Sequence, residues 1–185
     1  MSIIKEDEAE EKGIVEVAQL MLVSAKTAPK ASGIDDVSAA IVYGKEKEDL
    51  TLEMEKMAEE RNVPNFKRDA INVRDSSAVV LVGVRGMRSL GLNCGGCGYS
   101  SCKEFEESEK QMGKDFTGPN CIFKLLDLGI ALGSAVKTAS ILNVDNRIMY
   151  RIGTAAKRLN LLPEASIIVG IPLSSKSKSV YFDRK

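Results

Sequence analysis

All four cysteines of this chain lie between positions 94 and 121. Three belong to the sequence CGGCGYSSC and the fourth follows later, which gives the spacing C-x2-C-x4-C-x18-C. A ligand held by all four sulfurs would have to bring the two ends of this stretch together. The cysteine pattern is therefore the strongest constraint that the sequence places on the fold.

This spacing favours a 4Fe-4S cluster. Such a cluster needs four converging thiolates, and a short Cys-x-x-Cys loop lets two of them reach neighbouring corners. Gly95, Gly96 and Gly98 allow unusual backbone angles and let peptide N–H groups come close to sulfur. The predicted ligands are Cys94, Cys97, Cys102 and Cys121.

The residues around the third cysteine predict a helix start. Ser101 and Glu104 have the spacing of a capping box, which places Cys102 in the first turn. The partial positive charge of a helix N-terminus would offset the negative charge of a thiolate-ligated cluster. Cys121 would close the cage from the start of the next helix, so the cluster would pin an exposed helix onto the protein body.

Other uses of four cysteines stay open. A structural zinc usually takes two separate close pairs, whereas only Cys94 and Cys97 form one here. Disulfides are disfavoured in a chain expected to be intracellular, where thiols stay reduced. A redox-active Cys-x-x-Cys pair would leave Cys102 and Cys121 unexplained.

Composition narrows the remaining functions. Basic and acidic residues both number 26, so no net field attracts nucleic acid or an anionic membrane. Histidine is absent, which excludes Ser-His and Cys-His couples, His-ligated zinc hydrolases and Rieske clusters. The acidic opening does not read as a secretory signal, and we expect a cytoplasmic protein.

Hydrophobic spacing predicts alternating helices and strands. Helices are expected over 13–27, 45–61 and 122–142, and a further one, capped by Asp145, is expected to run through Leu159. Strands are expected over 37–43, 78–84 and 166–171, and the polar stretch 65–77 is expected to be irregular. Lys124, Asp127 and Lys137 interrupt the most apolar stretch, so it is expected to be a core helix and not a membrane span.

Two motifs carry a family resemblance. CGGCGYSSC with a distant cysteine resembles the small Fe-S module of electron-transfer proteins in anaerobic metabolism, including Rnf-type subunits and carbon monoxide dehydrogenase complexes. Through DLGIALGSAVKTASILNVDNR and GIPLSSKSKSVYFDR, nearly the whole chain resembles the uncharacterised family of ferredoxin-domain-containing proteins. That resemblance implies a cofactor without implying a reaction.

The order of elements is also similar to the flavin-dependent nitroreductase fold, which implies a homodimer holding FMN between its subunits. Ala28-Pro29 matches the usual Ala-Pro-Ser step, with Lys30 in place of the serine. The Asn and Gln-Pro-Trp that usually follow are absent, as is the basic Arg-x-Ser-x-Arg opening.

Candidate flavin contacts follow from this resemblance. At the end of the first helix the cationic and hydroxyl candidates are Ser24, Lys26 and Lys30. A second group comprises Lys176, Lys178 and Arg184. The alternative for both groups is a solvated basic surface, because charged residues near chain ends are mostly exposed.

Together these observations predict an α+β protein with a nitroreductase-like mixed sheet flanked by helices. It would form one domain over 1–185 with a 4Fe-4S-binding insert at 88–122. The leading hypothesis is electron transfer with a redox partner protein or a small-molecule acceptor. The second is an enzyme in which the cluster feeds FMN, and the third is a structural four-cysteine zinc module.

Overall fold

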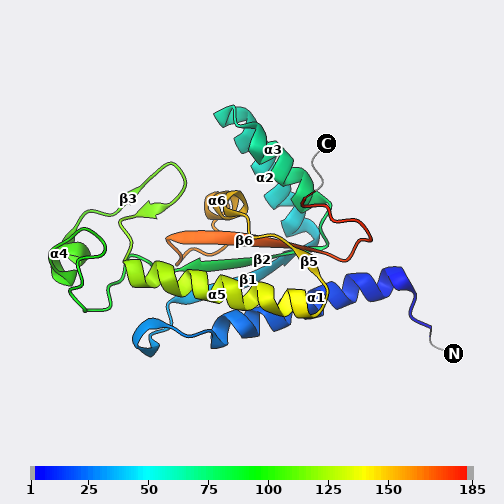
Figure 1. Cartoon of the computed structure of the whole chain (residues 1–185). Helices are drawn as coiled ribbons and strands as arrows, with labels where there is room; N and C mark the ends of the chain where they lie inside the picture. The colour runs from blue at the N-terminus through cyan, green and yellow to red at the C-terminus, as the bar shows by residue number, and fades with distance from the viewer. Residues whose placement is uncertain (1–2, 183–185) are drawn as a thin grey trace.

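A four-stranded antiparallel sheet separates two layers of helices (Figure 1). The structure, a computed structural model, describes residues 3–182. In spatial order the strands are β1 (Val37–Tyr43), β2 (Ala78–Val84), β6 (Ile167–Ser174) and β5 (Asp145–Asn146). The expected α+β class is confirmed.

The sheet is antiparallel in every described pairing and not mixed as expected. The reason lies in the connection from β1 to β2, which consists of two helices, α2 (Gly44–Arg61) and α3 (Pro64–Arg74). Two helices in succession return the chain to the end of the sheet that it left. Tyr43 therefore pairs with Ala78, and the second strand runs back along the first.

The centre of the molecule is β2, in which every residue is buried. Its side chains alternate between two cores, as the period of a strand requires. Val80 and Val82 face α1 (Glu6–Thr27) and α5 (Ile122–Ile141). Val79 and Leu81 face the core that is built with α2, α3 and α6 (Tyr150–Arg158). Each such side chain contributes roughly 1.5–3 kcal/mol by burial.

Tight backbone contact fixes α6 on the sheet. A Cβ atom on Gly153 would lie 1.7 Å from the carbonyl oxygen of Ile168, so only glycine lets the helix approach this closely. The N-cap of α6 is Met149, which also bridges to Gly170 of β6. Asp145, expected to cap this helix, lies in β5 instead, because the chain first pairs with the end of β6.

Most expected elements are present, although the strand expected over 166–171 is β6, which runs on to Ser174, and two helices also differ. The stretch expected to be irregular contains α3, a helix that begins with Pro64 at its first turn. Phe66, Ala70 and Val73 recur on one side of it and are buried. The first helix begins at Glu6, within the acidic run, because acidic side chains stabilise the N-terminal turn of a helix.

The cysteine segment, defined here as residues 87–120, leaves the sheet after β2 and returns at the start of α5. It contains the short helix α4 (Cys102–Glu107) and a hairpin of β3 (Gln111–Met112) with β4 (Thr117–Gly118). Figure 1 shows it extending from one end of the sheet, beside the first turn of α5. Among residues 3–182, no helix is long and apolar enough to cross a membrane.

Candidate functional site

The two ends of the cysteine segment are bonded to each other. The backbone N–H of Cys121 donates to the carbonyl oxygen of Gly86 at 2.7 Å. The hydroxyl of Ser166 accepts from the Gly86 N–H at 2.9 Å and lies 2.6 Å from Oδ1 of Asn120, to which it donates. These contacts bury Cys121 and fix where the segment starts and ends.

Asn93 closes the loop formed by residues 93–102, which is called the cysteine loop below. Its backbone N–H points at Sγ of Cys102 at 3.3 Å, and its Oδ1 accepts from the Cys102 N–H at 2.8 Å. Asn93 has a φ of 49°, in the left-handed region that asparagine tolerates better than most residues. The reciprocal pair joins residues 93 and 102, and thereby encloses a loop that carries three of the four thiols.

The start of α4 confirms the predicted Ser101 cap, whereas the Glu104 side chain reaches back to Ser100, one residue before the cap. Oγ of Ser101 accepts from the backbone N–H of Glu104 at 3.1 Å. The Glu104 carboxylate accepts from the backbone N–H of Ser100 at 3.0 Å and from its hydroxyl. The hydrogen bond from the Ser100 hydroxyl, together with that from its N–H, lowers the pKa of Glu104 below the usual value. Cys102 therefore occupies the first turn of α4, as predicted.

One aromatic side chain forms the interior of the cysteine segment. Phe105 is fully buried, whereas the rest of residues 87–120 are half-buried or exposed. The ring of Tyr99 meets it edge-on, with centroids 5.8 Å apart. The ammonium of Lys110 lies 4.1 Å from the centre of its ring on another side. Phe105 thus links the cysteine loop, α4 and the start of the hairpin.

The hairpin tip is anchored on the helical layer. Arg61, at the end of α2, forms an ion pair with Asp115 and donates to the carbonyl oxygen of Lys114 at 2.8 Å. The ring of Phe116 lies edge-on to Tyr150 of α6, at 6.4 Å between centroids. The segment therefore contacts the body at its hairpin as well as at its root.

The four thiols are free and differ in exposure. Cys94 is exposed, Cys97 and Cys102 are half-buried, and Cys121 is buried. A Cβ atom on Gly96 would lie 2.7 Å from the side chain of Ile122, which places the cysteine loop against the residue after Cys121. Within residues 3–182, however, no three or more Cys, Asp, Glu or His side chains take up a metal-ligating arrangement. The thiols share one end of the molecule without converging on a point.

The donor set nevertheless suits an iron–sulfur cluster. Cluster irons are held by cysteine thiolates, and all four thiols of the chain lie on or beside this segment. The N–H that Asn93 directs at a cysteine sulfur is the kind of contact that surrounds ligating thiolates. The positions of Cys94, Cys97, Cys102 and Cys121 are therefore compatible with the predicted role.

Sequence reasoning missed a buried ion pair beside the site. Lys124, in the first turn of α5, is fully buried and lies 2.8 Å from the carboxylate of Asp36. Arg88 lies 3.6 Å from the same carboxylate, on the solvent side. The available signal was a lysine inside an apolar helix, one turn after Cys121. Arg85 is exposed and donates its backbone N–H to the carbonyl oxygen of Asp36.

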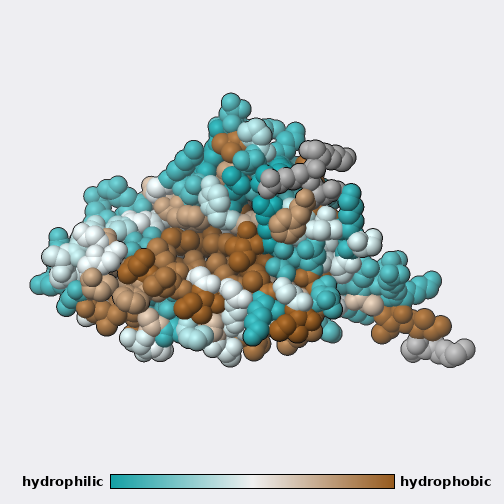
Figure 2. Space-filling view, in the orientation of Figure 1, coloured by the Kyte–Doolittle hydropathy of each residue, from teal (hydrophilic) through white to brown (hydrophobic). Residues whose placement is uncertain are grey.

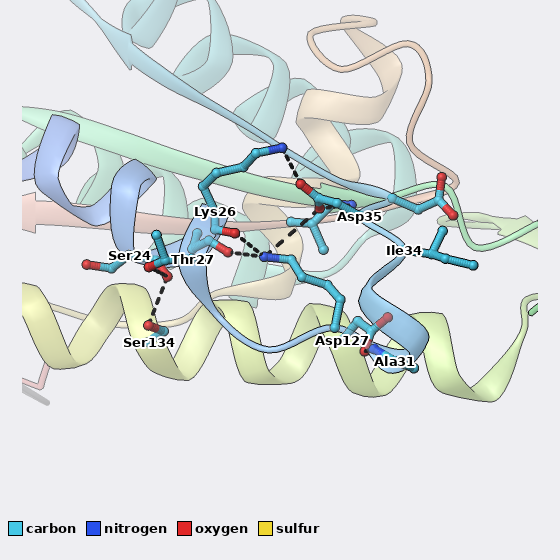
Figure 3. Close-up of polar contacts among 12 residues, drawn as sticks. Ser24, Lys26, Thr27, Ala31, Ile34, Asp35, Asp127 and Ser134 are labelled. Carbon is cyan, nitrogen blue, oxygen red and sulfur yellow. Dashed lines mark hydrogen bonds and ion pairs between the residues drawn. The ribbon is translucent and has the colours of Figure 1, made fainter.

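The candidate flavin contacts lie at the end of α1, and Figure 3 shows their surroundings. Lys26 forms an ion pair with Asp35, and Lys30 donates to the carbonyl oxygens of Ala25 and Lys26 at 2.7 and 2.6 Å. The hydroxyls of Ser24 and Thr138 lie 2.5 Å apart. The two lysine ammonium groups and the serine hydroxyl thus have partners within the chain, and they do not form a ready cradle for a flavin phosphate.

Electrostatics around Asp35 agree with this structural use. Partial burial raises its pKa, but the hydrogen bonds from Lys26 and from the Val37 N–H, with the charge of Lys30, outweigh that effect. The net result is a pKa of Asp35 below its ordinary value. The carboxylate therefore stays charged and holds both lysines at the end of α1.

The second basic group lies elsewhere. Lys176 and Lys178 line a hollow of about 870 Å³ between α3 and the chain that follows β6. Arg68 and Asn72 lie on its other side. Arg184 lies outside the described residues.

The layers and strand order define a nitroreductase-like α+β protein, and solved structures agree. Nitroreductase CinD from Lactococcus lactis, in complex with nicotinic acid, aligns over 100% of this chain and 85% of its own, with a TM-score of 0.57 and 13% identity. A putative nitroreductase from Desulfovibrio desulfuricans, in complex with FMN, aligns over 100% and 81%, with a TM-score of 0.54 and 13% identity. At such identities the likeness shows the fold alone.

The chain belongs to the family of uncharacterised proteins containing a ferredoxin domain. The family model matches residues 117–184, which include Cys121 but not the three earlier cysteines. A protein of Archaeoglobus fulgidus is 46% identical over 182 residues, which cover 98% of this chain and 97% of the relative. The predicted family and the nitroreductase-like fold are both confirmed.

Proposed function

We propose that this protein binds one 4Fe-4S cluster through Cys94, Cys97, Cys102 and Cys121 and acts in electron transfer. The observation that carries the proposal is the gathering of all four free thiols at one end of the molecule, on and beside a segment whose two ends are bonded together. Membership of a ferredoxin-domain family supports it. Residues 88–122 would be the cluster-binding insert of a single domain spanning 1–185.

The bound cluster would supply one-electron transfer, and the chain's own residues would set its surroundings. The Asn93 N–H points at the sulfur of Cys102 and would donate to it in the bound state. The buried ring of Phe105 excludes water behind the loop. The exposed position of Cys94 leaves one edge open to a redox partner protein or a small-molecule acceptor. A cytoplasmic setting would keep the thiols reduced before assembly.

Anoxic purification tests this proposal. We expect brown protein with about four irons and matching acid-labile sulfide per chain. Cys102→Ser should lower the iron content and destabilise the segment, because metal binding and folding are coupled. Leu92→Ser is the matched control, since it alters an exposed loop residue that is not a predicted ligand.

Two results would contradict the cluster. Folded protein with neither iron nor sulfide would refute it, and one zinc per chain would favour the structural zinc module. Wild-type iron content in Cys102→Ser would refute the four-ligand assignment specifically.

A flavin-linked oxidoreductase is the second candidate, because a similar fold holds FMN in the Desulfovibrio desulfuricans protein. In that case FMN would accept electrons from the cluster and pass them to a small substrate. The proposed contacts are Ser24, Lys26 and Lys30, of which the lysines would have to leave their present partners. Stoichiometric yellow flavin released on denaturation would support this candidate, whereas colourless supernatant would count against it.

We also propose a homodimer, formed through the outer face of α5. Figure 2 shows hydrophobic residues gathered over this helix and the adjoining edge of the sheet. Leu126 and Ile130 are 52% and 47% exposed. Gly129 and Gly133 lie on the same face, with open space where a Cβ would be. Small residues beside apolar ones allow a second helix to pack closely.

Sedimentation measures this association directly. Ile130→Glu should convert a dimer into a monomer, because it would bury an unpaired charge in the interface. Leu52→Glu is the control, since Leu52 is also an exposed aliphatic residue and lies on α2, in the opposite helical layer. A wild-type monomer at micromolar concentration would contradict the proposal.

A further inference from the structure

Asn93 makes two contacts with Cys102 that no other residue of the described chain reproduces at a thiol. The backbone N–H reaches the sulfur at 3.3 Å, and the side-chain oxygen accepts from the Cys102 N–H at 2.8 Å. The second contact satisfies a donor at the first turn of α4 that has no partner within the helix. One residue thus holds both the backbone and the sulfur of a predicted ligand.

The conformation of Asn93 is what directs its N–H at the sulfur. With φ at 49° the residue is left-handed, which turns its peptide plane relative to an extended chain. Glycine can adopt this conformation without strain, and alanine adopts it only at a cost. The side chain and the backbone therefore make separable contributions, and substitution can remove one or both.

Resting on the proposed cluster function, we infer that Asn93 is the positioning residue of the cluster site. Its side chain fastens the loop that carries Cys94, Cys97 and Cys102 before any metal binds. Its N–H raises the reduction potential of the bound cluster. The potential rises because an N–H···S contact stabilises the more negatively charged, reduced state.

The hydrogen bond from the Cys102 N–H to the Asn93 side chain can be tested on iron-free protein under reducing conditions. The amide of Cys102 should be protected from hydrogen exchange in the wild type, because it donates to Asn93 Oδ1. Asn93→Gly keeps the left-handed backbone and removes the acceptor, so this protection should be lost. Equal exchange in both proteins would overturn the fastening, whether or not the protein binds iron.

The effect of Asn93 on the reduction potential is tested on protein loaded with iron and sulfide. Asn93→Ala should shift the reduction potential to a more negative value and speed iron release to a chelator roughly tenfold. Asn93→Gly should release iron faster but keep a potential near that of the wild type, because the backbone N–H stays in place. Asn160→Ala is the matched control, since Asn160 is also left-handed, with φ at 56°, and lies after α6.

The outcomes separate this inference from the proposed function. If the wild type binds iron and sulfide, and Asn93→Ala has the same reduction potential and the same rate of iron release, the effect of Asn93 on the potential is refuted. The proposed cluster would be unaffected by that result. Wild type that takes up no iron would overturn the cluster, and with it the effect of Asn93 on the potential. In that case the exchange of the Cys102 amide still decides whether Asn93 fastens the loop.

Discussion

β2 and the cysteine segment follow each other in the chain and are built in opposite ways. Every residue of β2 is buried between two apolar cores. In the segment, Phe105 alone is buried, and shape depends on caps, backbone hydrogen bonds and ion pairs such as that of Arg61 with Asp115. The difference teaches that the body can stabilise itself by burial, whereas the segment has little apolar surface to bury and stands to gain most from a ligand that ties its thiols together.

The largest expected effect lies in the body. Leu81→Ala should lower the free energy of unfolding by about 2–5 kcal/mol, because Leu81 is fully buried at the centre of the sheet. Denaturant unfolding measures this, with the exposed Leu52→Ala as control. A decrease in the free energy of unfolding below about 1 kcal/mol would contradict the contrast between a body stabilised by burial and an exposed segment, since such small effects are typical of surface sites.

The next effect is confined to the segment. Phe105→Ala removes the one buried ring, so we expect residues 93–118 to lose protection from hydrogen exchange while the amides of β2 keep theirs. Because Phe105 is the one buried residue of the segment, the loss should be local and should lower the free energy of unfolding of the whole protein less than Leu81→Ala does. Phe105→Leu should preserve most of the protection. If Phe105→Ala weakened the whole protein as much as Leu81→Ala, body and segment would form one cooperative unit.

The hairpin anchor should contribute less. Arg61 and Asp115 are partly exposed, and a double-mutant cycle with Arg61→Gln and Asp115→Asn should give a coupling of about 0.2–1 kcal/mol. The more exposed pair of Lys56 and Glu60, at 3.8 Å, should give a coupling near zero. Equal values for both pairs would show that the hairpin tip is not anchored through this ion pair.

The smallest expected effect is a local loss of stability at acidic pH, at the start of α4. Hydrogen bonds from the Ser100 hydroxyl and N–H hold the pKa of Glu104 below its ordinary value, so the carboxylate stabilises the start of α4 at neutral pH. This contribution is lost as pH falls through the lowered pKa. In iron-free protein the Ser100 amide should then exchange faster, while the sheet stays protected. Glu104→Gln should abolish this pH dependence and Glu107→Gln should leave it intact; persistence in Glu104→Gln would implicate another group.

Local patterns were sufficient to predict much of the body. The expected strands 37–43 and 78–84 match β1 and β2, because a short run rich in β-branched residues favours a buried strand. α3 escaped notice because most of its exposed residues are polar and its stripe of Phe66, Ala70 and Val73 is narrow. The direction of pairing in the sheet depended on recognising that second helix.

At the site, sequence identified the four cysteines and the Ser101 cap, since both are short-range patterns. The pair of Lys124 with Asp36 joins residues far apart in the chain and has no local signature. Asn93 is likewise an ordinary polar residue in sequence, and its role emerges only when the chain returns at Cys102. Contacts between residues that are separated in the sequence could not be predicted from local sequence patterns.

The hydrogen bond from Cys121 to Gly86 has a consequence for protein engineering. Because both ends of the cysteine segment meet at one point of the body, we expect that a tight turn can replace the segment without displacing β2 or α5. The same geometry makes it transplantable as a cassette into another scaffold that offers two adjacent chain ends. Such grafting would separate the proposed cluster binding from the helix-and-sheet layers that stabilise the body.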